Sequence, residues 1–234
     1  MIGAENTLGY TMRIEIQEIS KRYGKKEILK NVSFSLEAGE CAGLLGGNGC
    51  GKSTLLSVLA GIIKPDSGSF CYKGNDLFLD PRSRARLVGY IPQGNPLIEE
   101  LSAWDNLLLY YSKERIRKEL DGGRISMLGI ESFLHVPVSK MSGGMKKRLS
   151  IAMSISEDPP ILLLDEITAA LDMVCKQTIA HYIESHKNRG GSVILVTHDI
   201  TELNLCDSLY ILKDGEVEPY TWDGDMDRLI RRFS

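Results

Sequence analysis

The residues with the clearest chemical capability form a glycine-rich segment with the pattern Gly46-x4-Gly51-Lys52-Ser53. Glycines at this spacing let consecutive backbone N–H groups converge on phosphate oxygens, and the start of a following helix adds positive partial charge. A chance glycine-rich turn is the alternative, but a predicted strand before the segment and a predicted helix after it favour phosphate binding. The predicted phosphate-binding residues are Gly46, Gly47, Asn48, Gly49, Cys50, Gly51, Lys52, Ser53 and Thr54.

Two residues of this segment have more specific expected roles. Lys52 would neutralise the β- and γ-phosphates of a nucleotide, and we therefore expect it to be catalytic as well as nucleotide-binding. The hydroxyl of Ser53 would bind Mg²⁺. A nucleoside triphosphate with magnesium is thus the predicted ligand.

Two carboxylates follow a run of four apolar residues, 161–164, which is typical of a buried strand. Ligands of open parallel sheets bind at the carboxyl ends of the strands, where Asp165 and Glu166 would emerge. We expect Asp165 to bind Mg²⁺ directly or through water, and Glu166 to orient and deprotonate an attacking water. The alternative is a turn with two solvated acids.

A third segment, Met141-Ser142-Gly143-Gly144-Met145, reads as a small-residue turn that opens a helix. Its hydroxyl and N–H groups form a second place where a phosphate can bind. One chain then has two anion sites but only one lysine-bearing loop. That asymmetry suggests that two copies of the protein share two nucleotides.

The composition is that of a soluble globular protein, with 43% hydrophobic and 25% charged residues in a chain of 234. No apolar run approaches the ~18–20 residues of a membrane helix, and residues 1–11 do not resemble a secretory signal. The net charge of −3 argues against a nucleic-acid partner. Five cysteines without metal-type spacing suggest a reducing compartment.

The hydrophobic pattern predicts an α/β fold in which a helical region interrupts a strand-rich region. Strands are expected at residues 12–19, 32–36, 41–45, 69–72, 88–91, 161–164 and 193–196, with a hairpin near 213–217. Helices are expected at residues 52–62, 104–111, 113–120, 142–156 and 174–186 and near the end of the chain. The short basic cluster Lys146-Lys147-Arg148 is expected on a solvated helix face.

With these segments in order, residues 12–229 resemble the ATP-binding subunit of ABC transporters. Met141-Ser142-Gly143-Gly144 with Arg148 matches the signature that separates ABC ATPases from other P-loop enzymes. The resemblance implies one ABC ATPase domain over 1–234, with a P-loop NTPase core built on a mixed, mainly parallel sheet. Residues 12–93 and 158–234 would form this core and an N-terminal antiparallel β subdomain, and residues 94–157 an inserted α-helical signature subdomain.

Further site residues follow from the same resemblance. Tyr23 matches the aromatic residue that stacks on adenine, and Gln93 matches the glutamine that reaches Mg²⁺ and water. His198 resembles the histidine that contacts the γ-phosphate and holds Glu166 in place. Asp172 lies in the loop that contacts the partner subunit in this family. The resemblance also implies that Ser142, Gly143 and Gly144 bind ATP held by that partner.

The chain departs from the family pattern at three positions, Met145, Ile167 and Ala169. The family usually has glutamine, proline and serine there, so these departures bear on loop rigidity and turnover rate and not on the reaction type. Met145 followed by basic residues resembles cassettes that serve separate permeases, often exporters. His135, His181 and His186 match no family position and are expected at the surface.

The resemblance implies an ATPase with ATP and Mg²⁺ as ligands that powers transport through a separate integral-membrane permease. It would lie on the inner face of the cell membrane and work as a homodimer, or as a heterodimer with a second ABC ATPase. Leu97, Ile98, Leu101 and Trp104 would line a groove for the permease, or pack in the core. A non-transport ABC ATPase, such as an iron–sulfur cluster assembly subunit, is the alternative, and the sequence identifies no cargo.

Overall fold

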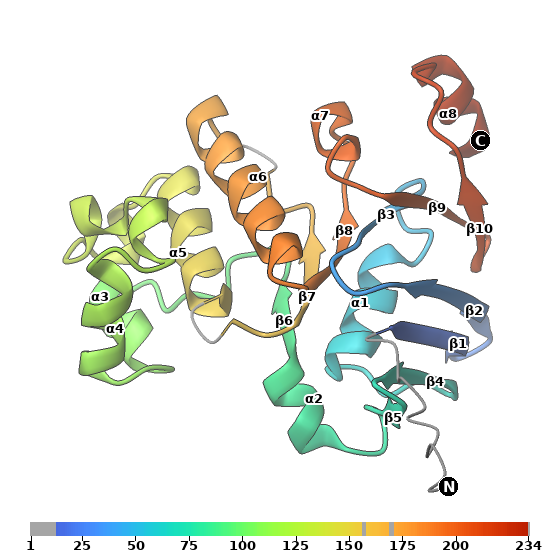
Figure 1. The fold of residues 1–234 in the computed structure, drawn as a ribbon, viewed down its shortest axis with the longest axis horizontal. Helices are drawn as coiled ribbons and strands as arrows, with labels where there is room; N and C mark the ends of the chain where they lie inside the picture. The colour runs from blue at the N-terminus through green and yellow to red at the C-terminus, as the bar shows by residue number, and fades with distance from the viewer. Residues whose placement is uncertain (1–12, 156–157, 169–170, 234) are drawn as a thin grey trace, which may run out of the picture.

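The computed structural model describes residues 13–155, 158–168 and 171–233, and these form two sheets and a helical lobe (Figure 1). The first sheet has the strand order β2-β1-β4-β5 and the second the order β10-β9-β3-β8-β7-β6. The strands are β1 Ile14–Tyr23, β2 Lys26–Leu36, β3 Cys41–Leu45, β4 Ser67–Tyr72, β5 Asn75–Asp76, β6 Val88–Ile91, β7 Ile161–Asp165, β8 Ser192–Val196, β9 Ser208–Lys213 and β10 Glu216–Tyr220. The α-helices are α1 Lys52–Ala60, α2 Pro81–Leu87, α3 Ala103–Leu108, α4 Lys113–Leu120, α5 Gly143–Ile155, α6 Met173–Asn188, α7 Ile200–Leu203 and α8 Met226–Phe233.

The six-stranded sheet is parallel from β9 to β6, and β10 closes it as an antiparallel edge. Every residue of β3, β7 and β8 is buried, as expected for parallel strands covered on both faces. Because parallel strands end at the same edge, β3, β6, β7 and β8 deliver the residues that follow them to one place. The sheet therefore brings together segments that lie far apart in the sequence.

Side chains alternate between the two faces of this sheet, and each face has its own hydrophobic core. Leu163 of β7 packs with α1 and the antiparallel sheet, whereas its neighbours Leu162 and Leu164 pack with α5 and α6. Helix α1 lies between the two sheets, where Leu55, Leu56, Val58 and Leu59 are buried. The N-terminal antiparallel sheet thus supports the helix that starts at Lys52.

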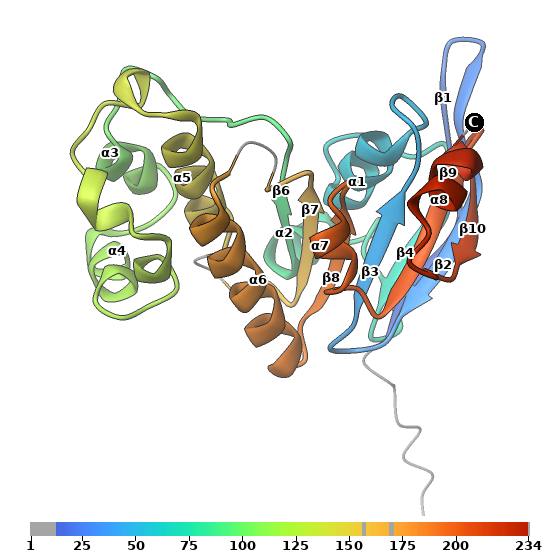
Figure 2. The ribbon, with the colours of Figure 1, turned by 90° about the horizontal axis from the view of Figure 1, so that it is seen from above.

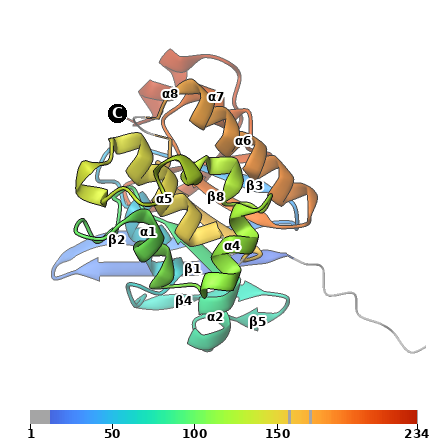
Figure 3. The same cartoon turned by 90° about the vertical axis from the view of Figure 1, so that its left-hand side faces the viewer.

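The described residues between β6 and β7 contain helices and turns, with one isolated β-bridge between Ser102 and Pro137. Helices α3, α4 and α5 form a lobe beside the sheet, with α6 along its boundary (Figures 2 and 3). Three short 3-10 helices lie between α4 and α5, at Ser126–Leu128, Ile130–Phe133 and Val138–Lys140. The fold class is confirmed, and the domain boundaries at residues 94, 157 and 158 stay predictions.

The hydrophobic pattern did not predict some helices and strands, and it predicted others as shorter than they are. Helix α2 was not predicted, although Asp80 caps it by accepting a hydrogen bond from the Ser83 N–H at 3.0 Å, with Pro81 at the first helical position. Strands β1 and β2 extend beyond the two predicted strands and pair as an antiparallel hairpin, and the register shifts between them interrupt the alternation on which the prediction relied. The predicted ends at Met12 and Ser156 lie outside the described residues.

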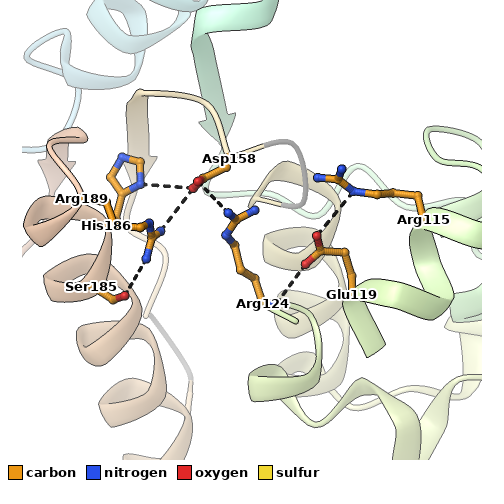
Figure 4. A network of polar contacts seen from close by, with 7 residues as sticks. All are labelled: Arg115, Glu119, Arg124, Asp158, Ser185, His186 and Arg189. Carbon is orange, nitrogen blue, oxygen red and sulfur yellow. Dashed lines mark hydrogen bonds and ion pairs between the residues drawn. The ribbon is translucent and has the colours of Figure 1, made fainter. Parts of the chain in front are cut away.

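A polar network joins the helical lobe to the core on the side where β7 begins (Figure 4). The Asp158 carboxylate lies 2.6 Å from a guanidinium nitrogen of Arg124 and 3.2 Å from one of Arg189. Nδ1 of His186 is 3.7 Å from the same carboxylate. Glu119 of α4 extends the network by accepting the backbone N–H of Arg124 at 3.0 Å. Asp158 therefore ties the segment that follows α4 to the carboxyl-terminal end of α6.

The expectation of a surface position for His186 is wrong, whereas His135 and His181 are exposed as expected. His186 is 2% exposed, and Gly191 packs so closely that a Cβ atom there would lie 2.1 Å from the imidazole Nε2. Burial lowers the pKa of His186, while the Asp158 carboxylate opposes this shift. Folding therefore favours the neutral form of this imidazole.

We expect the free energy of unfolding to decrease as the pH falls below about 6.5, the ordinary pKa of histidine. The unfolded state binds a proton at His186 more readily in that range than the folded state, whose His186 pKa is lowered, so acid favours unfolding. Urea titrations at pH 7.5 and 5.5 should show a smaller loss in His186→Gln than in the parent. His181→Gln, on the exposed face of the same helix, is the control and should keep the parental loss.

Candidate functional site

The glycine-rich loop joins β3 directly to α1 and has a conformation that requires glycine. Gly46 has φ 150° and Gly51 has φ 119°, both in the range that L-residues rarely adopt. A Cβ atom at Gly46 would lie 2.3 Å from the carbonyl oxygen of Leu212, and one at Gly51 would lie 3.1 Å from that of Ile28. The loop therefore turns tightly at the end of β3, and its backbone amides precede the first turn of α1.

Lys52 lies within this loop and is 6% exposed. Its ammonium donates hydrogen bonds to the carbonyl oxygens of Gly46 at 2.7 Å and Gly47 at 3.0 Å. Two carbonyls partly compensate for the desolvation of the charge, but no carboxylate is within ion-pair distance of it among the described residues. The amine is therefore well placed to pair with an anion that enters the loop.

The loop forms one wall of a hollow of about 430 Å³. This hollow brings together predicted residues that lie far apart in the sequence, from Tyr23 to Glu166. Its lining residues are Tyr23, Ile28, Asn48, Gly49, Gly51, Lys52, Ser53, Thr54, Gln93 and Glu166. Tyr23, which is 49% exposed, presents an aromatic ring at the same opening, so there is a surface for a base beside the phosphate loop.

Glu166 is held between two neighbours that come from different strand ends. The side-chain amide of Gln93 donates to one carboxylate oxygen at 2.8 Å, and Nε2 of His198 lies 3.2 Å from the other. The Glu166 backbone has φ 48°, and its N–H donates to the carbonyl of Val196 at 3.0 Å. Its orientation is therefore fixed by both backbone and side chain, as a general base requires.

Asp165 ends β7 directly before Glu166 and is 2% exposed. Burial raises the pKa of Asp165, an effect that a hydrogen bond from Ser53 partly offsets. Ser53, Asp165 and Gln93 supply only oxygen ligands, which suits Mg²⁺. The described residues contain no cluster of three or more His, Cys, Asp or Glu side chains that could hold a metal. A magnesium ion here would therefore need phosphate and water ligands as well, which is its usual preference.

Ser142, Gly143 and Gly144 lie at the start of α5 and do not line the hollow that contains Lys52. The Ser142 hydroxyl accepts the backbone N–H of Met145 at 3.3 Å and so caps the helix. Ser142 and Gly143 are exposed, and a Cβ atom at Gly143 would meet nothing within 4 Å. This helix start is open to solvent within one chain.

Asp172 also lies apart from the hollow, and it caps α6 by accepting the Cys175 N–H at 2.8 Å. Ile167 is 1% exposed in the hydrophobic core, which accounts for an apolar residue at this position. Met145 packs against the same core. Ala169 and Ala170, the third departure and the start of the predicted partner-contacting loop, lie outside the described residues.

Sequence reasoning missed two features beside Glu166. A second hollow of about 510 Å³ contains Glu166 and His198 together with Lys176, Asp199 and the buried Glu202. The prediction that the basic cluster lies on a solvated face is wrong for Lys147, which is 4% exposed. No periodic pattern marks these residues, because their positions depend on contacts between elements distant in sequence.

The comparisons with known proteins agree with this geometry. The family model described as ABC transporter matches residues 29–169. The Nod factor export ATP-binding protein I of Rhizobium etli is 36% identical over 207 residues, which cover 86% of this chain but just under two thirds, 66%, of that relative. The lantibiotic transport ATP-binding protein SrtF of Streptococcus pyogenes is 33% identical over 205 residues, covering 87% of this chain and 88% of SrtF.

Among solved structures, a dimeric post-hydrolysis state of the ATP-binding cassette MJ0796 bound to ADP and Pi aligns with a TM-score of 0.79 and 28% identity. The alignment covers 91% of this chain and all of that one. The fold and the phosphate loop thus define a P-loop ATP-binding cassette. The chain belongs to the ABC transporter family.

Proposed function

We propose that this chain binds ATP with Mg²⁺, hydrolyses the ATP, and thereby powers transport of a substrate through a separate membrane permease. The observation that carries the proposal is the position of Glu166, fixed by Gln93 and His198 in the hollow that also contains the lysine-bearing loop. The chain spans less than two thirds of the Nod factor relative, so the proposal concerns the cassette alone.

The residues divide into binding and catalytic groups. The loop amides and Lys52 would bind the phosphates, Tyr23 would stack on the adenine, and Ser53, Asp165 and Gln93 would hold the metal. Bound Mg²⁺ would neutralise charge on the β- and γ-phosphate oxygens. Glu166 would take a proton from the attacking water while Gln93 and His198 keep its carboxylate oriented.

We propose that two cassettes complete each site. The exposed helix start with Ser142, Gly143 and Gly144 would serve as an N-terminal anion site, and it does not line the hollow that contains its own loop. In a dimer it would contact the γ-phosphate bound by the partner, with Asp172 near that partner's loop. The dimeric state of the similar cassette MJ0796 supports this arrangement, and both a homodimer and a heterodimer with a second ABC ATPase satisfy it.

Mixing two inactive variants tests the composite site. Glu166→Gln keeps an intact Ser142 and Ser142→Arg keeps an intact Glu166, so a mixed dimer would contain one complete site. We expect the mixture to regain part of the parental ATPase activity. Glu166→Gln mixed with Lys52→Ala is the matched control, because it leaves no complete site and should stay inactive. Equal inactivity of both mixtures would contradict the proposal.

The permease is the proposed membrane partner, and the proposed location is the inner face of the cell membrane. No helix in the described part of the chain has the length and apolar character needed to span a membrane. The residues after Gln93 offer a docking surface, with Ile98 45% exposed while Leu97 and Trp104 pack partly against the core. Asn106 fixes this surface by bonding both the N–H and the carbonyl of Ile98, at 2.9 and 3.1 Å. We further propose residues 94–157 as the subdomain that carries it.

Sedimentation with membranes tests the transport role. The purified chain should bind inside-out vesicles of its source cell, and protease treatment of the vesicle surface should abolish that binding. Binding to protein-free vesicles of the same lipids would contradict a permease partner. The names of two relatives, one for Nod factor export and one for lantibiotic transport, favour transport over cluster assembly. Recovery of a soluble assembly complex instead would support the alternative.

A further inference from the structure

Lys147 is a buried lysine in α5 to which the proposed reaction assigns no role. We infer that Lys147 is a positioning residue. It bonds helix α5 to the main chain at Gln93 and so fixes the position of Glu166 relative to the Ser142 end of that helix. This inference rests on the proposed function, because it assigns a task within the same ATPase site.

The contacts of Lys147 cross from the helical lobe to the core. Its ammonium donates hydrogen bonds to the carbonyl oxygens of Pro92 at 2.7 Å and Gln93 at 3.1 Å, directly after β6. The residue is 4% exposed and lies in the second turn of α5, one turn beyond the Ser142 cap. One side chain therefore connects the helix start with the segment that presents Gln93.

The neighbouring basic residues make contacts of a different kind. Lys146 pairs with Glu99 at 2.6 Å, at a partly exposed position of the helical lobe. Arg148 lies over the ring of Phe133 and donates to the carbonyl of Leu128 at 3.1 Å, also within the helical lobe. Of the three residues in this basic cluster, Lys147 alone bonds Pro92 and Gln93, the two residues directly after β6, whereas Lys146 contacts the same connection further along, at Glu99.

The environment of Lys147 shows that its position has an energetic cost. Desolvation lowers the pKa of Lys147 to about 8, whereas the nearby carboxylates of Asp165 and Glu166 favour its charged form. An unpaired ammonium is costly to bury, so the two carbonyl acceptors are needed to compensate. A methionine of similar length would fill the same space without this cost, so packing alone does not require a lysine here.

The consequence is a continuous set of bonds between the two halves of the site. Lys147 holds the Gln93 backbone, the Gln93 side chain donates to Glu166 at 2.8 Å, and Glu166 lies 3.2 Å from His198. When the Ser142 end of α5 engages a phosphate, a displacement of the helix would shift Gln93 with it. Misplacement of catalytic groups by about 1 Å can cost about 10²-fold in rate.

The test compares Lys147→Met with Lys146→Met, which removes the neighbouring charge. We expect Lys147→Met to lower kcat for ATP by about 10- to 100-fold, with the affinity for a fluorescent ATP analogue within about twofold of the parent. Lys146→Met should keep the parental kcat. Lys147→Arg should recover part of the loss, because a guanidinium can donate to both carbonyls.

A double-mutant cycle separates a positioning role from general packing. If Lys147 acts through Gln93, Lys147→Met should change kcat by less than about twofold in a Gln93→Ala background. An undiminished loss in that background, or a kcat equal to that of Lys146→Met, would overturn the inference. Lys147→Gln, whose amide can also donate, replaces the methionine variant if the latter does not fold.

Hydrogen exchange distinguishes failure of this inference from failure of the proposed function. Residues 92–97 should exchange faster in Lys147→Met than in Lys146→Met, whether or not the parent hydrolyses ATP. A parent without ATPase activity would reject the proposed function, and the exchange result would still decide whether Lys147 holds this segment. An active parent with unchanged exchange in Lys147→Met would reject the inference alone.

Discussion

Replacing Glu166 with glutamine is expected to lower the turnover number for ATP by about 10²–10⁴-fold, the usual contribution of a general base. A neutral amide cannot take the proton of the attacking water. The replacement has nearly the same shape and can still accept the Gln93 hydrogen bond that Glu166 accepts at 2.8 Å. ATP affinity should therefore stay close to the parental value, and ATP-bound dimers should accumulate.

Steady-state phosphate release and size-exclusion chromatography with ATP would measure these effects. Glu202→Gln is a matched control, because Glu202 lies in the adjoining hollow but does not line the hollow that contains Lys52. Parental turnover in Glu166→Gln would assign the base to another residue.

Replacing Lys52 with alanine is expected to weaken ATP binding by about 10- to 100-fold. Hydrogen bonds to charged groups contribute about 1.5–3 kcal/mol each, and tenfold in affinity corresponds to about 1.4 kcal/mol. In the described structure the ammonium bonds two loop carbonyls, from which it can turn to phosphate oxygens without crossing bulk solvent. Titration with a fluorescent ATP analogue would give the affinity directly.

Lys26→Ala provides the control for the loss of a nearby positive charge. Lys26 is exposed and lines an adjoining hollow that does not contain Lys52, Ser53 or Glu166, so its removal should change affinity by less than about twofold. Equal affinities of Lys52→Ala and the parent would exclude the glycine-rich loop as the phosphate site.

The phosphate loop and the two carboxylates of the candidate site could be predicted because their signals are local in the sequence, whereas Gln93 and His198 were assigned through the family resemblance. The segment from Gly46 to Ser53 carries its own conformational requirement, and the apolar runs of β7 and β8 identify buried parallel strands without knowledge of their partners. Topology then brings Gln93, Glu166 and His198 to the same edge. In the structure these three residues follow three different strands, and Gln93 and His198 both contact Glu166.

The burial of Lys147 and His186 could not be predicted, because each side chain is covered by a segment that is distant in the sequence. Lys147 bonds carbonyls of residues 92 and 93, and His186 packs against Gly191 and the Asp158 network. In sequence both have the charge and helical context of solvated residues. Only the approach of the helical lobe to the core distinguishes them from exposed residues such as His181.

The Asp158 network has a mechanical consequence for the helical lobe. It lies near the carboxyl end of α5, whereas Ser142 lies at the opposite end of this 13-residue helix, which at 1.5 Å per residue is about 20 Å long. If the network acts as a pivot, a rotation of about 10° there would move Ser142 by about 3.5 Å, roughly the reach of one hydrogen bond. A small rotation at Asp158 would then be enough to make or break a phosphate contact at Ser142. The helix would act as a lever.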